Sequence, residues 1–533
     1  MLHVDLATGA THEGAAPVAD DGWGGPIAAL RILAEGLDDP LPPVVLVAGA
    51  VGGVVAPGLA RMAAVGVSPL SGRVAETRAE GPFAAGLRRA GVTGLALHGA
   101  AAEPVVVVVR DGAVTLTPAT TLIGLDTGPA TDALLDTFGA DAAVAVIGPA
   151  GEHRVPYASV VTCRHHPLPR LGFGAVLGER HVKAIVCVGT EVPPVASPLS
   201  LARIAFRYGA AIPGNPLAAW QKADPGFGIW RGAPGFAMVD NFRDTATPSG
   251  MEPEAAPAPE SVAPCPGCPT DCIKVFGGAG LHQEALVMLG DLALNARCLQ
   301  AGLDPVSLGA RLAAAGIAPT AAIISAIAGG EAEPPLTDEL MAVGGVELPP
   351  FDPRVQPNLA LAGAAAPIGP RYDIVEHDFD FVAGGLDYSF DEVRAIGVTV
   401  PREPGALDPV GTAILMRLYS GLDALNVCLF AATPTRPLLR RDVEDLVAAV
   451  TGERPDILAL GARRLQLMND INARLGVVAE TLPDRFFDEP VQAGPWAGAV
   501  LDRDAFDAAL RRLRADLFEE PDPVNQSTIE RTS

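Results

Sequence analysis

Three cysteines close together constrain this chain more than any other feature: Cys265-Pro-Gly-Cys268-Pro-Thr-Asp-Cys272. A fourth candidate lies far along the chain, in Asp423-Ala-Leu-Asn-Val-Cys428. The prolines at 264, 266 and 269 favour a stiff turn over a helix. Thiolates at this spacing can converge on one soft metal centre, and Cys428 would complete its ligand set while joining two distant parts of the chain.

The spacing alone is compatible with three interpretations of these thiols. An iron-sulfur cluster is favoured, because a four-thiolate zinc site usually shows two Cys-x-x-Cys pairs and the second pair is missing here. Structural zinc and free thiols are the alternatives. Cys163, Cys187 and Cys298 have no place in the pattern, and we expect them to be buried structural cysteines.

Composition narrows the class of protein. With 533 residues and 49% hydrophobic residues, the chain can bury a large core and should divide into several domains. The net charge of -24 argues against nucleic acid as a partner, and it would repel an acidic ferredoxin unless one surface patch were locally basic. No basic-plus-apolar leader opens the chain, and prolines and glycines interrupt the apolar run from Leu41 to Val55, so we expect neither a signal peptide nor a membrane span. Seven cysteines without a disulfide-like array suit a reducing cytoplasm.

The two halves of the chain differ in pattern. Up to about residue 190, Val/Ile/Leu runs alternate with glycine-rich turns, and residues 104–117 predict a hairpin closed by Asp111-Gly112. Residues 247–264 have the composition of an extended connector. After the cysteines, helical spacing of apolar residues predicts helices over 284–302, 405–428, 440–451, 455–475 and 504–518. The sequence therefore predicts a β-rich first part and a mainly helical second part.

Short motifs along nearly the whole chain occur in the order of one known family. Besides the cysteines, they include Asp5-Leu-Ala-Thr-Gly9, Ser68-Pro-Leu-Ser-Gly72, Ile147-Gly-Pro-Ala-Gly-Glu152, Gly174-Ala-Val-Leu-Gly178 and Leu482-Pro-Asp-Arg-Phe486. On these motifs the chain resembles the tungsten-containing aldehyde:ferredoxin oxidoreductase family. The resemblance implies an α+β fold: a β-rich pterin-binding domain of two related sheets (1–196), a helical domain with the cysteine loop (197–335) and a C-terminal helical domain with the fourth cysteine (336–533).

The resemblance also implies cofactors and the residues that hold them. Cys265, Cys268, Cys272 and Cys428 would bind a 4Fe-4S cluster beside a tungsten or molybdenum bis-molybdopterin, with magnesium as a candidate bridge between the pterin phosphates. Arg61 would lie between cluster and pterin, and Asp423 would accept hydrogen bonds from the pterin ring. The other positions matched to pterin contacts are Arg78, Gly81, Arg170, Gly172, Gly174, Leu303, Asp304 and Val427. An ordinary ion pair for Arg61 and an ordinary helical carboxylate for Asp423 are the alternatives.

The family reaction is oxidation of an aldehyde to a carboxylate, with electrons leaving through the cluster to a ferredoxin-like acceptor; the altered active-site positions also leave a related substrate open. Glu284 matches the family's active-site glutamate, which would take a proton from a water or hydrate; a helix N-terminal glutamate is the alternative. Tyr372 aligns nearest to the family's active-site histidine, and His377 follows a few residues later. A surface or core-edge position is the alternative for both, and is favoured for His377. Homodimers occur in the family, and the sequence gives no independent evidence for one here.

Several pterin loops depart from the family pattern. The family's Asn-x-Gly-Gly turn reads Arg78-Ala-Glu80-Gly81, so a carboxylate replaces a glycine where phosphate would bind. The glycine-rich loop at 170–174 keeps its arginine and two of three glycines, and the element at 299–304 keeps only its second acid. An alternative function follows: a divergent homologue without the full pterin cofactor, acting as an iron-sulfur electron-transfer or scaffold subunit. A protein with a structural zinc site and no redox function is a weaker third possibility.

Overall fold

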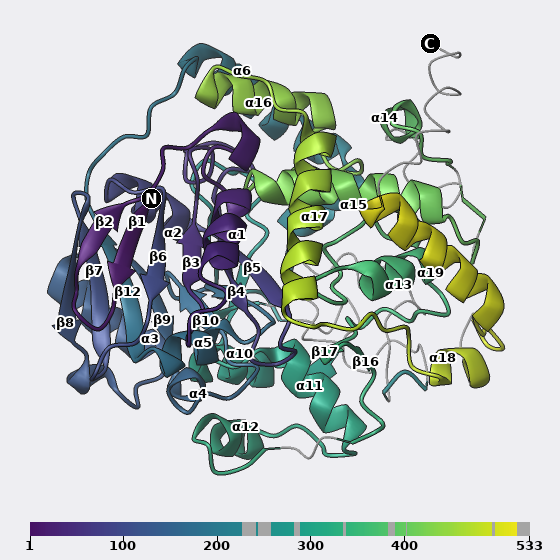
Figure 1. Ribbon diagram of the computed structural model, residues 1–533, viewed down its shortest axis with the longest axis horizontal. Coiled ribbons are helices and arrows are strands. Elements are labelled where there is room, and N and C mark those ends of the chain that lie inside the picture. The colour runs from purple at the N-terminus through teal and green to yellow at the C-terminus, as the bar shows by residue number, and fades with distance from the viewer. Residues whose placement is uncertain are drawn as a thin grey trace.

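The computed structural model describes residues 1–225, 241–243, 257–281, 288–333, 337–381, 390–400, 402–403, 405–492 and 496–519. Strands of the N-terminal region lie on the left of Figure 1, and helices of the second half lie on the right. This confirms the predicted α+β division. None of the helices within these ranges is both long enough and apolar enough to cross a bilayer.

Two six-stranded sheets form the N-terminal region. The first contains β1 (Leu2–Asp5), β2 (Thr11–Glu13), β3 (Val44–Val47), β4 (Arg61–Val67), β5 (Val74–Glu80) and β6 (Gly94–His98), in the order β2-β1-β6-β3-β4-β5. The second contains β7 (Val105–Arg110), β8 (Ala113–Pro118), β9 (Ala143–Ile147), β10 (Val160–Thr162), β11 (His166–Leu168) and β12 (Val182–Val188), in the order β8-β7-β12-β9-β10-β11.

The two orders are the same connectivity used twice. β1 pairs with β6 in parallel, as β7 does with β12, and the other neighbours are antiparallel in both sheets. The predicted hairpin is confirmed as β7 and β8, which pair up to Arg110 and Ala113 around the Asp111-Gly112 turn. The expectation of two related sheets is thus confirmed at the level of topology.

Helices join the sheets into one core. α2 (Pro82–Arg89) packs against β4 of the first sheet and against β9 and β12 of the second. A Cβ on its Gly86 would lie 2.1 Å from the Cβ of Ala143, so this close approach requires glycine. α1 (Pro26–Glu35) covers β3 and β4, and α3 (Thr127–Phe138) covers β9. Apolar side chains of both sheets share one large core cluster.

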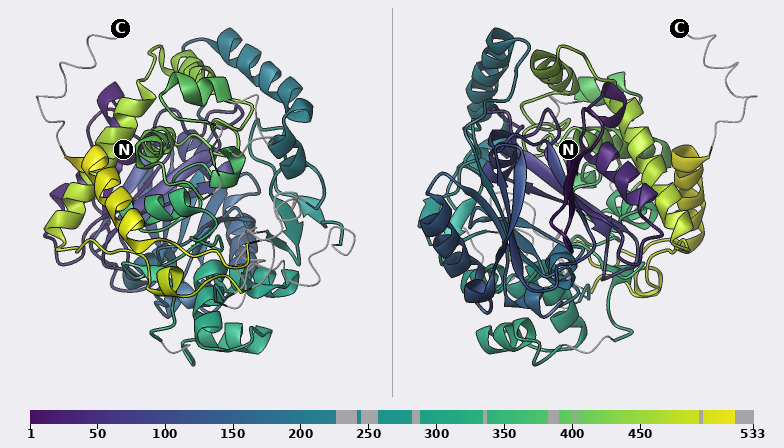
Figure 2. Two further views of the ribbon diagram at one scale, coloured as in Figure 1. Left: turned by 90° about the vertical axis from the view of Figure 1, so that its right-hand side faces the viewer. Right: turned by 60° about the vertical axis from the view of Figure 1, so that its left-hand side comes forward.

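The second half contains mostly helices. They are α6 (Pro198–Ala211), α7 (Pro216–Lys222), α10 (Leu292–Ala301), α11 (Pro305–Ala314), α12 (Ala321–Ala328), α13 (Pro357–Ala365), α14 (Phe390–Ala395), α15 (Pro409–Ala424), α16 (Arg440–Thr451), α17 (Ile457–Arg474), α18 (Arg485–Asp488) and α19 (Arg503–Phe518). α15 and α17 cross closely: a Cβ on Gly461 would lie 1.8 Å from the carbonyl oxygen of Arg417. α6 lies at the outer rim in both views of Figure 2.

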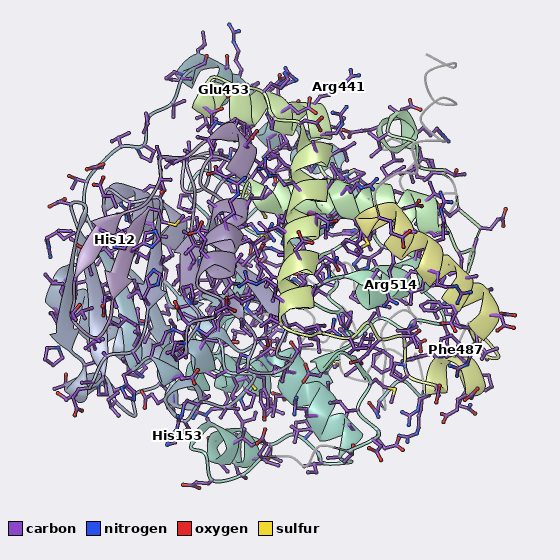
Figure 3. All side chains as sticks on the ribbon, viewed as in Figure 1. His12, His153, Arg441, Glu453, Phe487 and Arg514 are labelled. Carbon is purple, nitrogen blue, oxygen red and sulfur yellow. The ribbon has the colours of Figure 1, made fainter. Side chains whose placement is uncertain are left out.

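Four of the five predicted helices match α15, α16, α17 and α19, within a few residues at each end. The fifth matches α10, which begins at Leu292; residues 282–287 lie outside the described ranges, as does most of the predicted connector. Charged side chains such as Arg441 and Glu453 lie on the outside, as Figure 3 shows. The domain boundaries after residues 196 and 335 remain predictions.

Candidate functional site

The cysteine loop is closed by a short sheet and packs directly on the N-terminal region. β13 (Ser261–Val262) pairs with β14 (Lys274–Phe276), so the intervening residues form a loop. Inside it, the amide of Cys268 donates to the carbonyl of Cys265 at 3.1 Å. Gly267 has a φ of 75°, and a Cβ there would lie 2.6 Å from the backbone nitrogen of Ala56. Only glycine permits this approach.

The distant cysteine reaches the same place. The amide of Cys428 donates to the carbonyl of Gly58 at 2.8 Å, so this segment and the cysteine loop both pack on residues 55–58. The pKa of the Cys265 thiol is raised well above its usual value by burial and then by the charges of Cys272, Cys428 and Cys268. The pKa of Cys428 is raised by burial, Glu80, Cys272 and Cys268. The charges of the four thiols thus act on one another, which places these cysteines in one neighbourhood of the fold.

Four thiols form a donor set of the kind that an iron-sulfur cluster takes. No group of three or more His, Cys, Asp or Glu side chains among the described residues is arranged to hold one metal ion. The positive charge of the iron atoms would oppose the mutual repulsion of the thiolates, which together with burial raises the thiol pKa values. The four thiols thus fit the cluster that the resemblance implies. Cys187 and Cys298 are buried as expected, whereas Cys163 is partly exposed.

A charged face of β5 lies beside the cysteines. Glu76, Arg78 and Glu80 alternate along this strand, so their side chains share one face of the sheet. Arg78 is 3% exposed and donates through Nε to Glu76 at 3.0 Å and through Nη1 to Asp373 at 2.9 Å. Its Nη2 lies 2.7 Å from Asp423. A buried strand with three charges on one face is the local sequence signal for this network.

Arg61 connects this face to the distant cysteine. Its Nη1 donates to Asp423 at 2.9 Å and to the carbonyl of Val427 at 2.8 Å. Its Nε lies 2.9 Å from Glu80. Burial lowers the pKa of Arg61, but the charges of Glu80 and Asp423 outweigh it and hold the pKa above its usual value. Arg61 therefore stays charged beside Cys428.

Two further arginines complete a balanced network. Arg371 donates to Asp373 at 2.8 Å, and Arg464 donates to Glu76 at 2.9 Å. Burial alone would raise the pKa of Asp373, but Arg371 and Arg78 lower it below its usual range. Four guanidinium groups thus face four carboxylates, those of Glu76, Glu80, Asp373 and Asp423. Glu76, Arg371, Asp373 and Arg464 were not among the predicted site residues.

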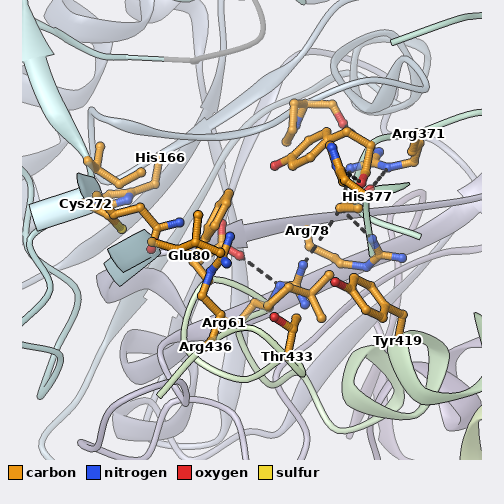
Figure 4. A pocket seen from close by; sticks show the side chains of 18 of the residues that line it. Arg61, Arg78, Glu80, His166, Cys272, Arg371, His377, Tyr419, Thr433 and Arg436 are labelled. Atoms are coloured by element: carbon orange, nitrogen blue, oxygen red, sulfur yellow. Dashed lines mark hydrogen bonds and ion pairs between the residues drawn. The ribbon is translucent and has the colours of Figure 1, made fainter. Parts of the chain in front are cut away.

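A cavity opens between this network and the cysteine loop (Figure 4). Charged and polar residues on its wall are Arg61, Arg78, Glu80, His165, His166, Gln221, Cys272, Arg371, Asp373, Glu376, His377, Thr433 and Arg436. Apolar and aromatic residues, among them Phe351, Tyr372, Tyr419 and Phe430, line the rest. Because Cys272 and Arg61 both line the cavity, one thiol of the cysteine loop lies next to a space that a ligand can occupy.

Both predicted substitutes for the family histidine lie on this wall. His377 Nε2 is 3.1 Å from the carbonyl oxygen of Tyr372, and the His377 ring packs edge-on against Phe351. The pKa of His377 is lowered to about 4, mainly by burial, although Glu376 raises it in part. The imidazole is therefore neutral near pH 7. Glu284, the predicted proton acceptor, lies outside the described residues.

The other predicted pterin contacts form a separate group. Arg170 donates to the carbonyl of Glu347 and lies 3.8 Å from Asp304, whose carboxylate caps α11 by accepting from the amide of Ser307 at 2.8 Å. Asp304 Oδ1 and Arg170 Nε are buried without hydrogen-bond partners among the described residues. Leu303 is fully buried. None of these residues lines the cavity. Two orphaned polar atoms here fit a second polar ligand group.

The three predicted glycines have packing roles of their own. Gly81 has a φ of 115°, and a Cβ there would lie 2.5 Å from the His166 ring. A Cβ on Gly172 would meet the carbonyl oxygen of Pro156 at 2.1 Å. At Gly174 it would lie 2.7 Å from the backbone of Ala158. Close packing, against a side chain at Gly81 and against backbone at Gly172 and Gly174, therefore favours glycine at these positions, whatever ligand the site holds.

Comparison with known proteins assigns the family. Residues 1–189 match the model of the N-terminal domain of aldehyde ferredoxin oxidoreductase, and residues 328–515 match that of its domains 2 and 3. The chain belongs to the aldehyde ferredoxin oxidoreductase family. As a member it is an oxidoreductase. The cysteine loop lies between the two matched segments, and Cys428 lies within the second.

Curated relatives extend the likeness over most of the chain. The tungsten-containing aldehyde ferredoxin oxidoreductase of Pyrococcus furiosus is 27% identical, over 88% of this chain and 88% of its own. The enzyme of the same description from Thermococcus kodakarensis is also 27% identical, over 94% and 93%. Among solved structures, the active-site complex BamBC of benzoyl coenzyme A reductase with 1,5-dienoyl-CoA superposes with a TM-score of 0.76 at 18% identity, over 99% and 98% of the two chains. That similarity supports the fold.

Proposed function

We propose that the protein is a tungsten or molybdenum bis-pterin enzyme that oxidises an aldehyde to a carboxylate and passes electrons to a ferredoxin-like acceptor. In the balanced half-reaction, aldehyde and water give carboxylate, protons and an electron pair. The observation that carries the proposal is the gathering of four thiols beside a cavity whose wall includes Cys272, Arg61 and Arg78. The names of the curated relatives support the choice of metal and substrate.

The residues divide into those that would hold cofactors and those that would handle protons. The four cysteines would hold a 4Fe-4S cluster, and Arg61, Arg78 and Asp423 would hold the metal pterin beside it. When bound, these groups supply the redox chemistry: they accept an electron pair and release its electrons singly. Tyr372 is placed to donate a hydrogen bond to the substrate oxygen, and His377, neutral near pH 7, is placed to orient the substrate by hydrogen bonding. Glu284 is proposed as the proton acceptor.

The electron acceptor would dock on α6 and α7, which contact the cysteine loop. The Tyr208 hydroxyl of α6 lies 2.6 Å from the Thr270 hydroxyl, and Lys222 of α7 donates to the carbonyl of Pro269 at 2.6 Å. On its outer side, α6 exposes Arg203, Arg207 and Phe206, the last at 78% exposure. On a chain of net charge -24, Arg203 and Arg207 give α6 a locally basic face of the kind that an acidic ferredoxin needs, although Arg207 Nη2 lies 3.0 Å from Asp442. An apolar ring at its centre suits a small transient interface.

One observation favours a second candidate function. Both oxygens of Asp423 are engaged by guanidinium groups of Arg61 and Arg78, and Glu80 occupies a position where the family has glycine. A homologue that keeps the cluster and lacks a complete pterin cofactor, acting as an electron-transfer or scaffold subunit, would tolerate both features.

Metal analysis separates the two candidates. The protein is purified without oxygen from a host supplied with tungstate and molybdate, and metals and pterin are measured alongside aldehyde-dependent reduction of a viologen dye. The enzyme should contain about four irons and one tungsten or molybdenum per chain and should reduce the dye. Iron without tungsten, molybdenum or pterin would favour the cluster-only subunit. Zinc alone would contradict both.

A further inference from the structure

Arg436 differs from the other arginines on the cavity wall. Arg61, Arg78 and Arg371 are each in ion pairs with carboxylates. Arg436 is 8% exposed, and no carboxylate of the described residues lies within ion-pairing distance of its guanidinium group. Its Nε is buried without a hydrogen-bond partner among those residues. A buried guanidinium with unused donors is costly unless a ligand supplies the acceptor.

The protein holds Arg436 in place on a rigid turn. Its Nη1 donates to the Thr435 hydroxyl at 2.9 Å, and that hydroxyl donates to Glu376 at 2.9 Å. The carbonyl of Thr435 accepts from Asn215 at 3.1 Å, and the amide of Arg436 donates to the carbonyl of Thr433 at 3.0 Å. Glu376 thus orients Arg436 through a neutral hydroxyl and leaves the rest of the guanidinium for another partner.

The surroundings of Arg436 suit an organic anion. Figure 4 shows Arg436 among the residues around the cavity. Phe351, Phe430 and Leu429 add apolar wall to the same space. A planar guanidinium with free N–H donors matches a carboxylate, with which it can form two parallel hydrogen bonds. An aromatic or aliphatic body would contact the apolar wall.

We propose that Arg436 binds a carboxylate on the substrate, so that the preferred substrates are aldehydes carrying a second, anionic carboxylate group. This inference rests on the proposed aldehyde oxidation at the same site. Arg436 orients the aldehyde and fixes specificity, and it takes no part in the redox step.

The test compares a matched pair of aldehydes, benzaldehyde and 4-carboxybenzaldehyde, with the holoenzyme. Wild type should favour the carboxylated aldehyde in kcat/KM. Arg436→Gln should raise KM for that aldehyde by about 10- to 100-fold and change KM for benzaldehyde by less than about threefold. Arg436→Lys, which keeps the charge but loses the planar fork, should recover part of the loss. Arg474→Gln, at an exposed ion pair, is the control.

A second measurement does not depend on turnover. Calorimetric titration with terephthalate should show binding to wild type and about 10-fold or greater weakening in Arg436→Gln. If wild type oxidises neither aldehyde yet binds terephthalate through Arg436, the proposed reaction fails and the anion site stands. If the variant keeps both the substrate preference and the terephthalate affinity, the inference is wrong. A loss of pterin and metal from Arg436→Gln would also overturn it, because Arg436 would then hold a cofactor phosphate.

Discussion

Arg61 and Asp423 are separated by 362 positions, and their side chains meet at 2.9 Å in the buried network. Arg61 begins β4 of the first sheet, and Asp423 lies near the end of α15. The same guanidinium contacts Val427, next to Cys428. One ion pair therefore fixes the helical part of the chain against the sheet at the place where the fourth cysteine meets the other three.

Replacing Asp423 should destabilise the protein strongly. Asp423→Asn keeps the shape of the side chain but removes the charge that faces Arg61, Arg78 and Arg464. Leaving these buried guanidinium charges without their partner should lower the free energy of unfolding by about 3–5 kcal/mol. Chemical denaturation followed by circular dichroism measures the change. Asp38→Asn removes a similar pair with Arg474 at 3.0 Å on the surface and should cost under about 1 kcal/mol. Equal costs for the two variants would contradict a buried charged network.

Loss of Cys428 should remove the cluster. Cys428→Ser substitutes a hard oxygen for the thiolate that closes the proposed ligand set. We expect the iron content and the broad visible absorbance of the anaerobic protein to fall to a small fraction of the wild-type values. Cys163→Ser changes a partly exposed cysteine outside the set and should leave both unchanged. Equal iron loss in the two variants would argue against Cys428 as a ligand.

Local patterns predicted the secondary structure well because they depend on neighbours in sequence. The Asp111-Gly112 turn indicates its hairpin directly, and the apolar spacing of 440–451 coincides with α16. The resemblance supplied what spacing could not, namely which distant cysteine joins the loop. The structure then showed that both segments pack on residues 55–58.

The charged network and Arg436 could not be predicted in the same way. Arg371 and Asp373 lie outside the helices and strands, so no local pattern fixes the direction of their side chains. Arg464 lies on α17, and which side of that helix is buried depends on how it packs. Their partners are decided by tertiary contacts across hundreds of residues. Only β5 carried a local signal, the charges at 76, 78 and 80 on one face of a buried strand.

His166 should make stability depend on pH. Burial, followed by the charge of His165, lowers its pKa from 6.5 to about 3. The unfolded chain therefore takes up a proton on His166 as the pH falls below 6.5, and the folded chain does not. The contribution of neutral His166 to the free energy of unfolding is complete above pH 6.5 and is lost as the pH falls toward 3. In His166→Gln, the fall in unfolding free energy between pH 6 and 5 should be shallower by about 1.4 kcal/mol per pH unit.

Denaturation curves at several pH values test this, with His153→Gln as the control. His153 is exposed at the lower edge of the molecule in Figure 3 and so lies outside the buried surroundings of His166. An unaltered slope in His166→Gln would show that His166 does not take up its proton on unfolding.

Reversing the charge of α6 should weaken the interaction with an acidic electron carrier. Arg203→Glu combined with Arg207→Glu changes the charge of this face by four units and leaves the Tyr208–Thr270 contact with the cysteine loop in place. Charges at the rim of an interface act mainly on the association rate. KM for ferredoxin should therefore rise about tenfold at low salt, and the difference from wild type should shrink as salt is added. Reduction of a small viologen dye should be unchanged, since the dye needs no docking surface.

Arg512→Glu, at an exposed arginine of α19, is the control for net charge. If it raises KM for ferredoxin as much per charge as the α6 variant does, the effect is global repulsion, and α6 is not the docking surface.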